Sequence, residues 1–441
     1  MTHPPVPSTA PSGPSSSSAP SGPSGSSAPS GPSAPSGSSE ASAAALAREL
    51  FARRNRASQA FFPGECGRLA VACKEMAERF LRGGRLLAFG RGSYATDAQH
   101  VSVEFVHPVV VGKRALPALD LSAGFRERLP ALLRADDMVM GFGPPGGDPE
   151  VAAALALAQQ RGAQTFALPG SSEGGYSVAS VASVAAVAAT DADPYIHQEL
   201  IEIVYHTLWE TVHVFFEHRE LGHDVGESSF LYPYLGQRKQ DTSGVVAEVA
   251  ASILMKAQDD ERLRDEVAGA QAERLAGAAA AIGRRLAAGG KLIVFGNGGS
   301  ATDANDLALD CAAPRNGGRP IPALSLAMEP AILSAIANDI GPEAIFLRQL
   351  IAHAGSADVA VAISTSGGSA NILAALVEAR KRGLLTVALL GYDGGETLRR
   401  GLADFPLVVP CDYIPRIQEV QASTYHALLD LLAAADGGAP R

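Results

Sequence analysis

The sequence predicts an α/β protein with two tandem domains, each a parallel sheet covered by helices on both faces. Two observations lead to this prediction. Short apolar runs alternate with helical stretches, which is the pattern of strands buried between two layers of helices. The chain also repeats itself, because FLRGGRLLAFG at residues 80–90 aligns without a gap with LAAGGKLIVFG at residues 286–296. We therefore expect domains at residues 40–220 and 242–441, joined by a linker at 221–241.

Residues 1–39 are a low-complexity tail of proline, serine, glycine and alanine. Val6 is the one branched aliphatic residue in this stretch, so the tail has too little apolar surface to offset the entropy lost on ordering. We predict a disordered tail. Helical periodicity begins near Glu40, where Leu46, Leu50 and Phe51 fall on one side of a helix.

The first domain contains a series of strand-like apolar runs and ends in a long helix. Strands are expected at residues 85–89, 138–141, 165–168 and 184–189. A helix is expected at residues 149–161, and the closing helix at 193–218 corresponds to residues 416–433 of the second domain. The second domain is expected to begin with two helices, at residues 245–257 and 261–288.

A glycine-rich turn follows the first strand of the second domain. Residues 291–310, KLIVFGNGGSATDANDLALD, predict a strand, a tight turn and the start of a helix. Glycine lets backbone N–H groups approach an anion, and the first amides of a helix are unpaired. Gly296, Gly298 and Ala301 also fit the GxGxxA spacing of a dinucleotide-binding turn, so a Rossmann oxidoreductase is a rival interpretation.

A second loop decides between these interpretations. The strand expected at residues 358–363 runs into a loop with four hydroxyls and two glycines, before a helix at 370–381. The hydroxyl residues are Ser364, Thr365, Ser366 and Ser369. Hydroxyl donors, free amides and the helix dipole together form a clamp for a phosphate dianion. A Rossmann domain does not need this second loop, so we expect no nucleotide cofactor.

These spaced motifs resemble the sugar isomerase (SIS) domain, and most of all the phosphoheptose isomerases. The resemblance rests on GNGGS at 296–300, ISTSGGSAN at 363–371, Asn338 and Asp339 between them, RIQE at 416–419, and His426. It covers residues 246 to 441 closely. It implies a flavodoxin-like sheet in each domain, and aldose–ketose isomerisation of a sugar phosphate of the sedoheptulose 7-phosphate type, through an enediol.

The resemblance also implies a metal and acid–base set on two helices. Phosphoheptose isomerases carry a His and a Glu one turn apart after the first loop, and a Gln and a His eight residues apart on the closing helix. The first domain matches with His100, Glu104, Gln198 and His206, so these four are the expected metal ligands, with zinc the expected metal. Glu104 is the expected base, and His206 or His426 the expected acid. Eight residues rise about 12 Å along a helix, so spacing alone would not pair Gln198 with His206.

The second domain matches only half of that set. Gln418 and His426 remain, but Asp306 and Asp310 stand in place of the His and the Glu, which makes a zinc site there doubtful. The phosphate loops show the opposite asymmetry. In the first domain GFGPPG at 141–146 has no hydroxyl, and its two prolines remove backbone donors.

We therefore expect a composite site whose groups come from both domains. The phosphate is expected at Ser364, Thr365, Ser366 and Ser369, the sugar at Asn297, Gly298, Ser300, Asp339 and Gln418, and the acid–base groups at His100 and Glu104 of a first domain. Active sites of phosphoheptose isomerases lie between the subunits of a tetramer. The resemblance thus implies a homodimer of this chain that forms a pseudo-tetramer.

Composition excludes other classes of function. With 36 Lys and Arg against 46 Asp and Glu, the net charge of −10 and the lack of a basic cluster argue against nucleic acid. No apolar stretch reaches the length of a membrane span. The four cysteines lack CxxC spacing, so we expect buried thiols in a reducing cytoplasm. Two alternatives stay open: a non-catalytic sugar-phosphate-binding regulatory or assembly protein, and decayed relics in which His100 and Glu104 are an ordinary helix pair and His206 is a core histidine.

Overall fold

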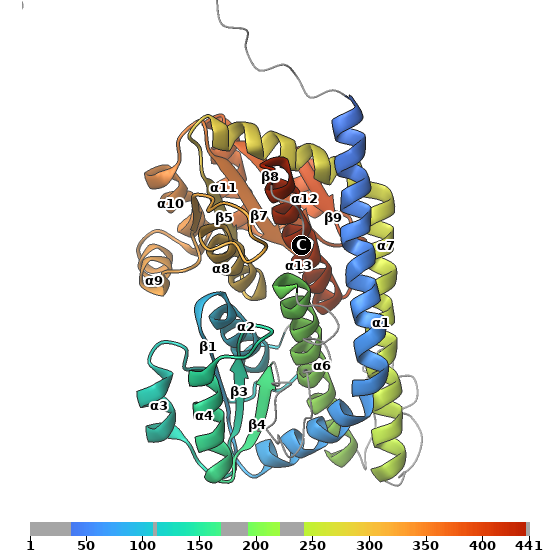
Figure 1. The fold of residues 1–441 in the computed structure, drawn as a ribbon. Helices are drawn as coiled ribbons and strands as arrows, with labels where there is room; N and C mark the ends of the chain where they lie inside the picture. Colours follow the sequence, from blue (N-terminus) through green and yellow to red (C-terminus); the bar gives the residue numbers. More distant parts are fainter. Residues whose placement is uncertain (1–36, 109–112, 169–192, 221–241, 438–441) are drawn as a thin grey trace, which may run out of the picture.

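The computed structural model describes residues 37–108, 113–168, 193–220 and 242–437 (Figure 1). Three predicted features lie outside these residues: the tail up to residue 36, the strand at 184–189 and the linker at 221–241.

The first sheet has four parallel strands in the order β2-β1-β3-β4. The strands are β1 (Leu86–Gly90), β2 (Ala118–Asp120), β3 (Met138–Phe142) and β4 (Gln164–Leu168). The helices that cover the sheet are α2 (Ala95–Val106), α3 (Phe125–Leu132) and α4 (Pro149–Gln160), with a short 3-10 turn η1 (Gly92–Tyr94) before α2. All five residues of β1, β3 and β4 are buried, as expected for strands between two helical layers.

The second sheet repeats this plan with one more strand, in the order β6-β5-β7-β8-β9. Its strands are β5 (Leu292–Gly296), β6 (Ala323–Ser325), β7 (Val359–Ser364), β8 (Leu385–Leu390) and β9 (Phe405–Val408). Its helices are α8 (Gly299–Ala312), α9 (Pro330–Asp339), α10 (Ile345–His353), α11 (Ala370–Lys381) and α12 (Gly395–Arg399), with η3 (Pro342–Ala344). The predicted fold class, two parallel sheets flanked by helices, is confirmed.

Two long helices connect the sheet domains. Helix α1 (Gly37–Leu81) and helix α7 (Thr242–Ala287) run side by side along both of them (Figure 1). They are antiparallel, because Asn55 bonds to Asp265 at 2.8 Å and the later Ser58 bonds to the earlier Glu261 at 2.8 Å. Helix α7 is continuous where we predicted two helices. Residues 258–260 contain no glycine or proline to end it, and Asp260 is held in the interior by Arg416 at 3.1 Å.

Each of these two helices packs one part of its length into the first core and another part into the second core. The start of α1, including Leu50 and Phe51, packs into the core of the second sheet domain, whereas residues 57–80 pack into the first. The start of α7, including Val249 and Ile253, packs into the first core, and residues 263–282 pack into the second. Each core therefore contains residues from both of the predicted domains.

Helix α6 (Pro194–Glu220) runs along the first sheet domain and helix α13 (Ile414–Ala435) along the second, and their N-terminal halves meet (Figure 1). They are antiparallel: His206 contacts Glu419 and the earlier Glu199 contacts the later His426. Their contact is rich in buried ionisable groups, unlike the aliphatic strands. In the described part of the chain, no helix combines the length and hydrophobicity that crossing a membrane requires.

Arg54 links α1 to this central pair. Its guanidinium is 1% exposed, and Nε donates to both carboxylate oxygens of Glu199 at 2.9 Å. Burial alone would raise the pKa of Glu199, but the charge of Arg54 and the hydrogen bond and charge of His426 lower it to about 2. The pair therefore contributes stability above the ordinary Glu pKa of 4.5, and this contribution is lost as pH falls towards 2.

Arg54→Met leaves Glu199 buried without its main counter-ion, so we expect the unfolding free energy at pH 7 to fall by about 3–5 kcal/mol. The difference in unfolding free energy between this variant and the parent should become smaller as pH falls from 4.5 towards 2. Chemical denaturation measures both. Arg56→Met is the matched control, because Arg56 pairs with Glu49 on the surface and exposed pairs contribute at most about 1 kcal/mol. Equal losses in the two variants would contradict the role given to Arg54.

Candidate active site

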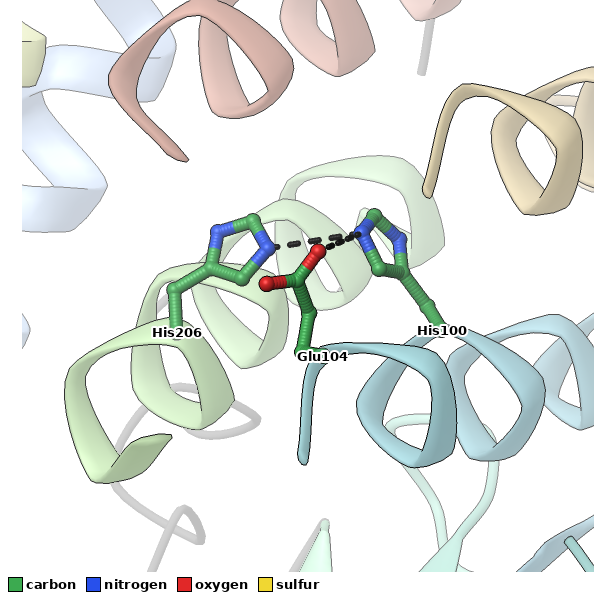
Figure 2. Close-up of side chains that lie close together, drawn as sticks. All are labelled: His100, Glu104 and His206. Carbon is green, nitrogen blue, oxygen red and sulfur yellow. Dashed lines mark hydrogen bonds and ion pairs between the residues drawn. The ribbon is translucent and has the colours of Figure 1, made fainter. Parts of the chain in front are cut away.

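Three ionisable side chains of the first domain converge in the interior. His100 and Glu104 project from one face of α2, and His206 projects towards them from α6 (Figure 2). The two imidazole Nε2 atoms lie 3.4 Å apart, and Glu104 Oε1 lies 3.8 Å from His100 Nε2. All three side chains are buried. We name His100, Glu104 and His206 the first cluster.

The second domain contributes a glutamine to this cluster. Gln418 Nε2 lies 3.3 Å from His100 Nε2, and both atoms lie against Gly299 at the start of α8. A Cβ on Gly299 would lie 2.1 Å from Gln418 Nε2 and 2.6 Å from His100 Nε2, so any larger residue would push these two side chains away from their present positions. The GNGGS turn of the second domain therefore meets the first cluster within one chain.

Carboxylates of the second domain orient both histidines. Asp303 Oδ1 lies 3.4 Å from His100 Nδ1, and Glu419 Oε1 lies 2.8 Å from His206 Nδ1. Each contact occupies Nδ1 and leaves Nε2 directed into the cluster. This is the arrangement in which an imidazole donates its Nδ1–H to a carboxylate and offers Nε2 to a metal or a substrate.

Burial sets the acid–base character of the cluster. It raises the pKa of Glu104 to about 7. Among the described residues, neither oxygen of Glu104 has a hydrogen-bond partner. Burial, with the charges of His100 and Arg416, lowers the pKa of His206 well below its ordinary value. A carboxylate that titrates near neutral pH beside a neutral imidazole suits proton transfer.

The cluster geometry also fits one divalent metal. Two imidazole nitrogens that bind a tetrahedral zinc at about 2.0–2.1 Å are about 3.3 Å apart, close to the 3.4 Å between the two Nε2 atoms. Glu104 offers unpartnered oxygens, and Gln418 Oε1 is a further buried acceptor without a partner in the described chain. Two imidazoles and carboxyl or amide oxygens form a donor set that zinc accepts.

The structure does not bring Gln198 to the first cluster. Its Nε2 donates to Asp97 Oδ2 at 3.0 Å and to Asp306 Oδ1 at 3.1 Å, and its Oε1 accepts from Arg315. Gln198 and His206 stand two turns apart on α6, about 12 Å along its axis. Because α13 is antiparallel to α6, Gln418 reaches the first cluster in its place.

A second cluster occupies the corresponding position in the second domain. Asp306 and Asp310 of α8 lie with His426 of α13, whose Nε2 is 3.5 Å from Asp306 Oδ2 and 3.3 Å from Asp310 Oδ2. Burial opposes charge on His426, but hydrogen bonds with Asp306, Asp310 and Glu199 raise its pKa well above its ordinary value. His426, predicted as a possible acid, thus belongs to this second cluster and not to the first.

The predicted phosphate residues form the loop between β7 and α11. Gly367 N donates to Ser364 Oγ at 3.1 Å and Gly368 N to Ser366 Oγ at 3.3 Å, so these hydroxyls keep their own protons to donate. Ser369 precedes α11 and makes no side-chain cap, so the amides of Ala370 and Asn371 are left without a capping side chain. The amide of Ile372 donates to Asn371 Oδ1 at 2.9 Å. Thr365 is partly exposed in the same loop.

The GNGGS turn connects this loop to the first cluster. The side-chain amides of Asn297 and Asn371 bond to each other at 2.9 Å, which ties the turn to the first residues of α11. Gly298 has a positive φ of 58° and opens towards free space, and Ser300 is buried in the first turn of α8. These predicted sugar-binding residues therefore lie between the phosphate loop and the first cluster.

Asp339 lies apart from these groups. It is exposed at the C-terminal end of α9 and accepts a hydrogen bond from Asn338 at 2.8 Å. No residue of α9 is buried, so this helix lies on the surface of its sheet domain.

Comparison with known proteins matches the SIS domain to residues 258–391. A phosphoheptose isomerase of Geobacter sp. (strain M21) is 47% identical over 146 residues, which cover 33% of this chain and 75% of that protein. A phosphoheptose isomerase of Geobacter sulfurreducens is 42% identical over 189 residues, which cover 43% of this chain and 97% of that protein. The chain belongs to the phosphoheptose isomerase family of SIS-domain isomerases.

A solved structure matches both sheet domains. It is a proposed tagatose-6-phosphate ketose/aldose isomerase from Clostridium novyi NT, with a TM-score of 0.51 and 11% identity, and the match covers 91% of this chain and 90% of that one. At this identity the likeness concerns the fold alone. The structural match extends over both sheets, whereas the match to the SIS domain model is confined to residues 258–391 of this chain.

Sequence reasoning missed Asp303, Glu419 and Gly299, although the chain carries a signal for the first two. The triplet ATD occurs in both halves and ends in Asp97 and Asp303. Gln-Glu followed by Tyr-His occurs at 198–206 and again at 418–426. Residues retained in both halves while their neighbours diverge are candidates for the interface between the halves.

We expect Asp303→Asn to weaken binding of Zn²⁺ or Co²⁺ to the first cluster by about 10–100-fold, because the amide no longer fixes the His100 ring through a charged acceptor. Competition with a chromophoric chelator measures this. Asp97→Asn is the matched control, since Asp97 contacts Gln198 beside the second cluster and should leave the affinity within about twofold of the parent. If both substitutions weakened metal binding equally, Asp303 would have no specific role in orienting His100.

Proposed function

We propose that this protein isomerises a heptose phosphate between its ketose and aldose forms, of the sedoheptulose 7-phosphate to D-glycero-D-manno-heptose 7-phosphate type, through an enediol. The observation that carries the proposal is the contact of Gly299 with His100 and Gln418. This contact joins an acid–base cluster to a turn that leads to a hydroxyl-rich loop. Membership of the phosphoheptose isomerase family supports the choice of substrate.

The phosphate is assigned to the loop before α11. Ser364, Thr365, Ser366 and Ser369 supply hydroxyl donors, and the uncapped first turn of α11 supplies amides and the positive end of its dipole. Asn297, Gly298, Ser300 and Gln418 are assigned to the sugar hydroxyls. Asp339 lies on the surface of α9, so it would contact the sugar only if α9 moves towards the loop.

Proton transfer is assigned to the first cluster. Glu104, with a pKa of about 7 caused by burial, takes the proton from the carbon next to the carbonyl and returns it to the neighbouring carbon. His206 is neutral and directs Nε2 into the cluster, so it moves the proton between the two substrate oxygens. Burial excludes water, which protects the enediol from side reactions.

The same cluster would hold one divalent metal, for which zinc is proposed, through His100, Glu104, His206 and Gln418. Because the metal would occupy His206 Nε2, His206 transfers protons only in the metal-free cluster, and Glu104 has a second oxygen that stays available as the base. Such an ion would polarise the substrate oxygens and stabilise negative charge on the enediolate. We also propose that the protein is a homodimer with a pseudo-tetramer of sheet domains, as the family resemblance implies. Sedimentation equilibrium measures this oligomeric state directly.

Ser366→Ala with Ser369→Ala should weaken binding of a heptose phosphate at least about a hundredfold, because each hydroxyl donated to a dianion contributes about 1.5–3 kcal/mol. Isothermal titration calorimetry measures the affinity. Ser334→Ala, an exposed serine on α9, is the matched control and should not change it. Unchanged binding in the double variant would place the phosphate elsewhere.

Glu104→Gln should reduce kcat at least about a thousandfold while leaving the affinity for the sugar phosphate within about threefold, because it removes the base and not the clamp. Asp310→Asn, the counterpart in the second cluster, should matter much less. Steady-state kinetics and calorimetry on both variants measure the two quantities.

Mixing the Glu104→Gln chain with the Ser366→Ala/Ser369→Ala chain should restore no activity, since the first cluster meets its loop within one chain. Restored activity would show that sites form between chains. If Asp310→Asn abolishes turnover while Glu104→Gln does not, the chemistry belongs to the second cluster. Binding without turnover in the parent would favour the non-catalytic regulatory alternative.

A further inference from the structure

The second cluster has the same construction as the first but differs in what lies at its centre. Asp306, Asp310 and His426 occupy the positions that His100, Glu104 and His206 occupy in the first domain. The glutamines cross over in both cases, Gln418 to the first cluster and Gln198 to the second. Two carboxylates and an imidazole form a donor set suited to divalent metals such as Zn²⁺, Mn²⁺ or Co²⁺.

A guanidinium occupies this second cluster. Arg315 donates from Nε to Asp310 Oδ1 at 2.9 Å and from Nη2 to Asp310 Oδ2 at 2.7 Å, a bidentate pair. It also donates to Gln198 Oε1, the oxygen whose counterpart on Gln418 is unpartnered. The rings of Tyr94 and Tyr195 lie 4.9 Å and 5.0 Å from its central carbon and hold it from two sides.

The two clusters differ in the number of free acceptor atoms. In the first, both oxygens of Glu104 and the oxygen of Gln418 lack hydrogen-bond partners in the described residues. In the second, Asp306 accepts from Thr96 at 3.1 Å, from Gln198 at 3.1 Å and from Tyr425 at 3.0 Å. Asp310 is taken by Arg315. A buried carboxylate needs hydrogen-bond donors or a cation beside it. In the second cluster, the permanently charged Arg315 supplies both from within the chain.

We propose that the second cluster is a latent divalent-metal site that the Arg315 guanidinium holds closed, so that removing this guanidinium opens it. The argument rests on the contacts of Arg315 and does not require the isomerase activity. It predicts that the parent chain leaves this cluster without metal, and that replacing Arg315 is sufficient to allow metal binding.

In the first domain, the start of α4 is also filled by the chain itself. Asp148 begins α4 at the place where Ser369 begins α11, and its Oδ1 accepts from the amides of Glu150 at 2.8 Å and Val151 at 3.1 Å. A carboxylate thus occupies the anion-binding end of α4, and Arg91 lies 3.1 Å from it. A cavity of about 730 Å³ adjoins this end, and its two arginines, Arg91 and Arg126, pair with Glu150. Internal charged groups of the chain therefore fill the second cluster of the second domain and the start of α4 in the first domain.

The test counts bound metal with Co²⁺ as the probe. The purified chain is stripped with a chelator, loaded with Co²⁺ and desalted, and the ions per chain are measured by mass spectrometry together with the visible d–d absorption. Arg315→Met should bind one more Co²⁺ per chain than the parent. Arg315→Met with His426→Ala should return to the parent value. Arg319→Met is the matched control, because Arg319 is 76% exposed nearby and should leave the count unchanged.

The test measures the difference in bound Co²⁺ between Arg315→Met and the parent. Any metal in the first cluster is present in both chains and cancels in this difference. If the first cluster binds no metal, the parent count is zero and the Arg315→Met count is one. An Arg315→Met chain that folds and binds no more Co²⁺ than the parent overturns the proposal. If Arg315→Met is unstable, Co²⁺ should raise its Tm by more than it raises that of the parent. A chain that Co²⁺ does not stabilise, for both Arg315→Met and the milder Arg315→Gln, also overturns it.

Discussion

The reciprocal contact between α6 and α13 is the constraint on which the site depends. Glu419 bonds to His206 and Glu199 bonds to His426, so each helix supplies the carboxylate that orients the histidine of the other. The antiparallel pairing makes both contacts possible at once. A shift of one residue along either helix would move a buried carboxylate by about 1.5 Å and rotate it away from its partner. Because both carboxylates are buried, such a shift would leave unpaired charge in the interior, and the register is fixed for that reason.

In the proposed site, groups from both sheet domains complement one another. His100 and Glu104 come from a half whose phosphate loop has lost its hydroxyls, and the hydroxyl-rich loop comes from a half whose α8 carries two aspartates. Gly299 joins the two sets at contact distance. Each half is thus free to lose the groups that its partner supplies, provided that the interface stays rigid. Buried pairs between different helices, such as Arg54 of α1 with Glu199 of α6 and Arg416 of α13 with Asp260 of α7, supply that rigidity.

Much of the fold could be predicted from the sequence, because its signals are local. The apolar runs predicted β1, β3, β4, β5 and β7, whereas β2, β6, β8 and β9 were not predicted. The glycine turns marked the carboxyl ends of β5 and β7. The spacing of His100 and Glu104 placed both on one face of α2. Pairings set by tertiary packing could not be obtained this way. Gln198 satisfies the family spacing, yet the antiparallel packing sends it to the opposite cluster and brings Gln418 instead. Arg315 belongs to no recognised motif, and only the three-dimensional structure shows that its guanidinium lies in the second cluster.

The exchange of α1 and α7 between the two cores has a consequence for folding during synthesis. The strands and helices of the first half leave the ribosome before α7, yet Val249 and Ile253 of α7 complete their core. The first half therefore cannot close its apolar surface until the start of α7, up to Ala257, has been made. The start of α1 must in turn wait for the last sheet to appear. The two halves are then obligate co-folding partners and not independent modules, and chaperone binding to the nascent chain should persist until α7 emerges.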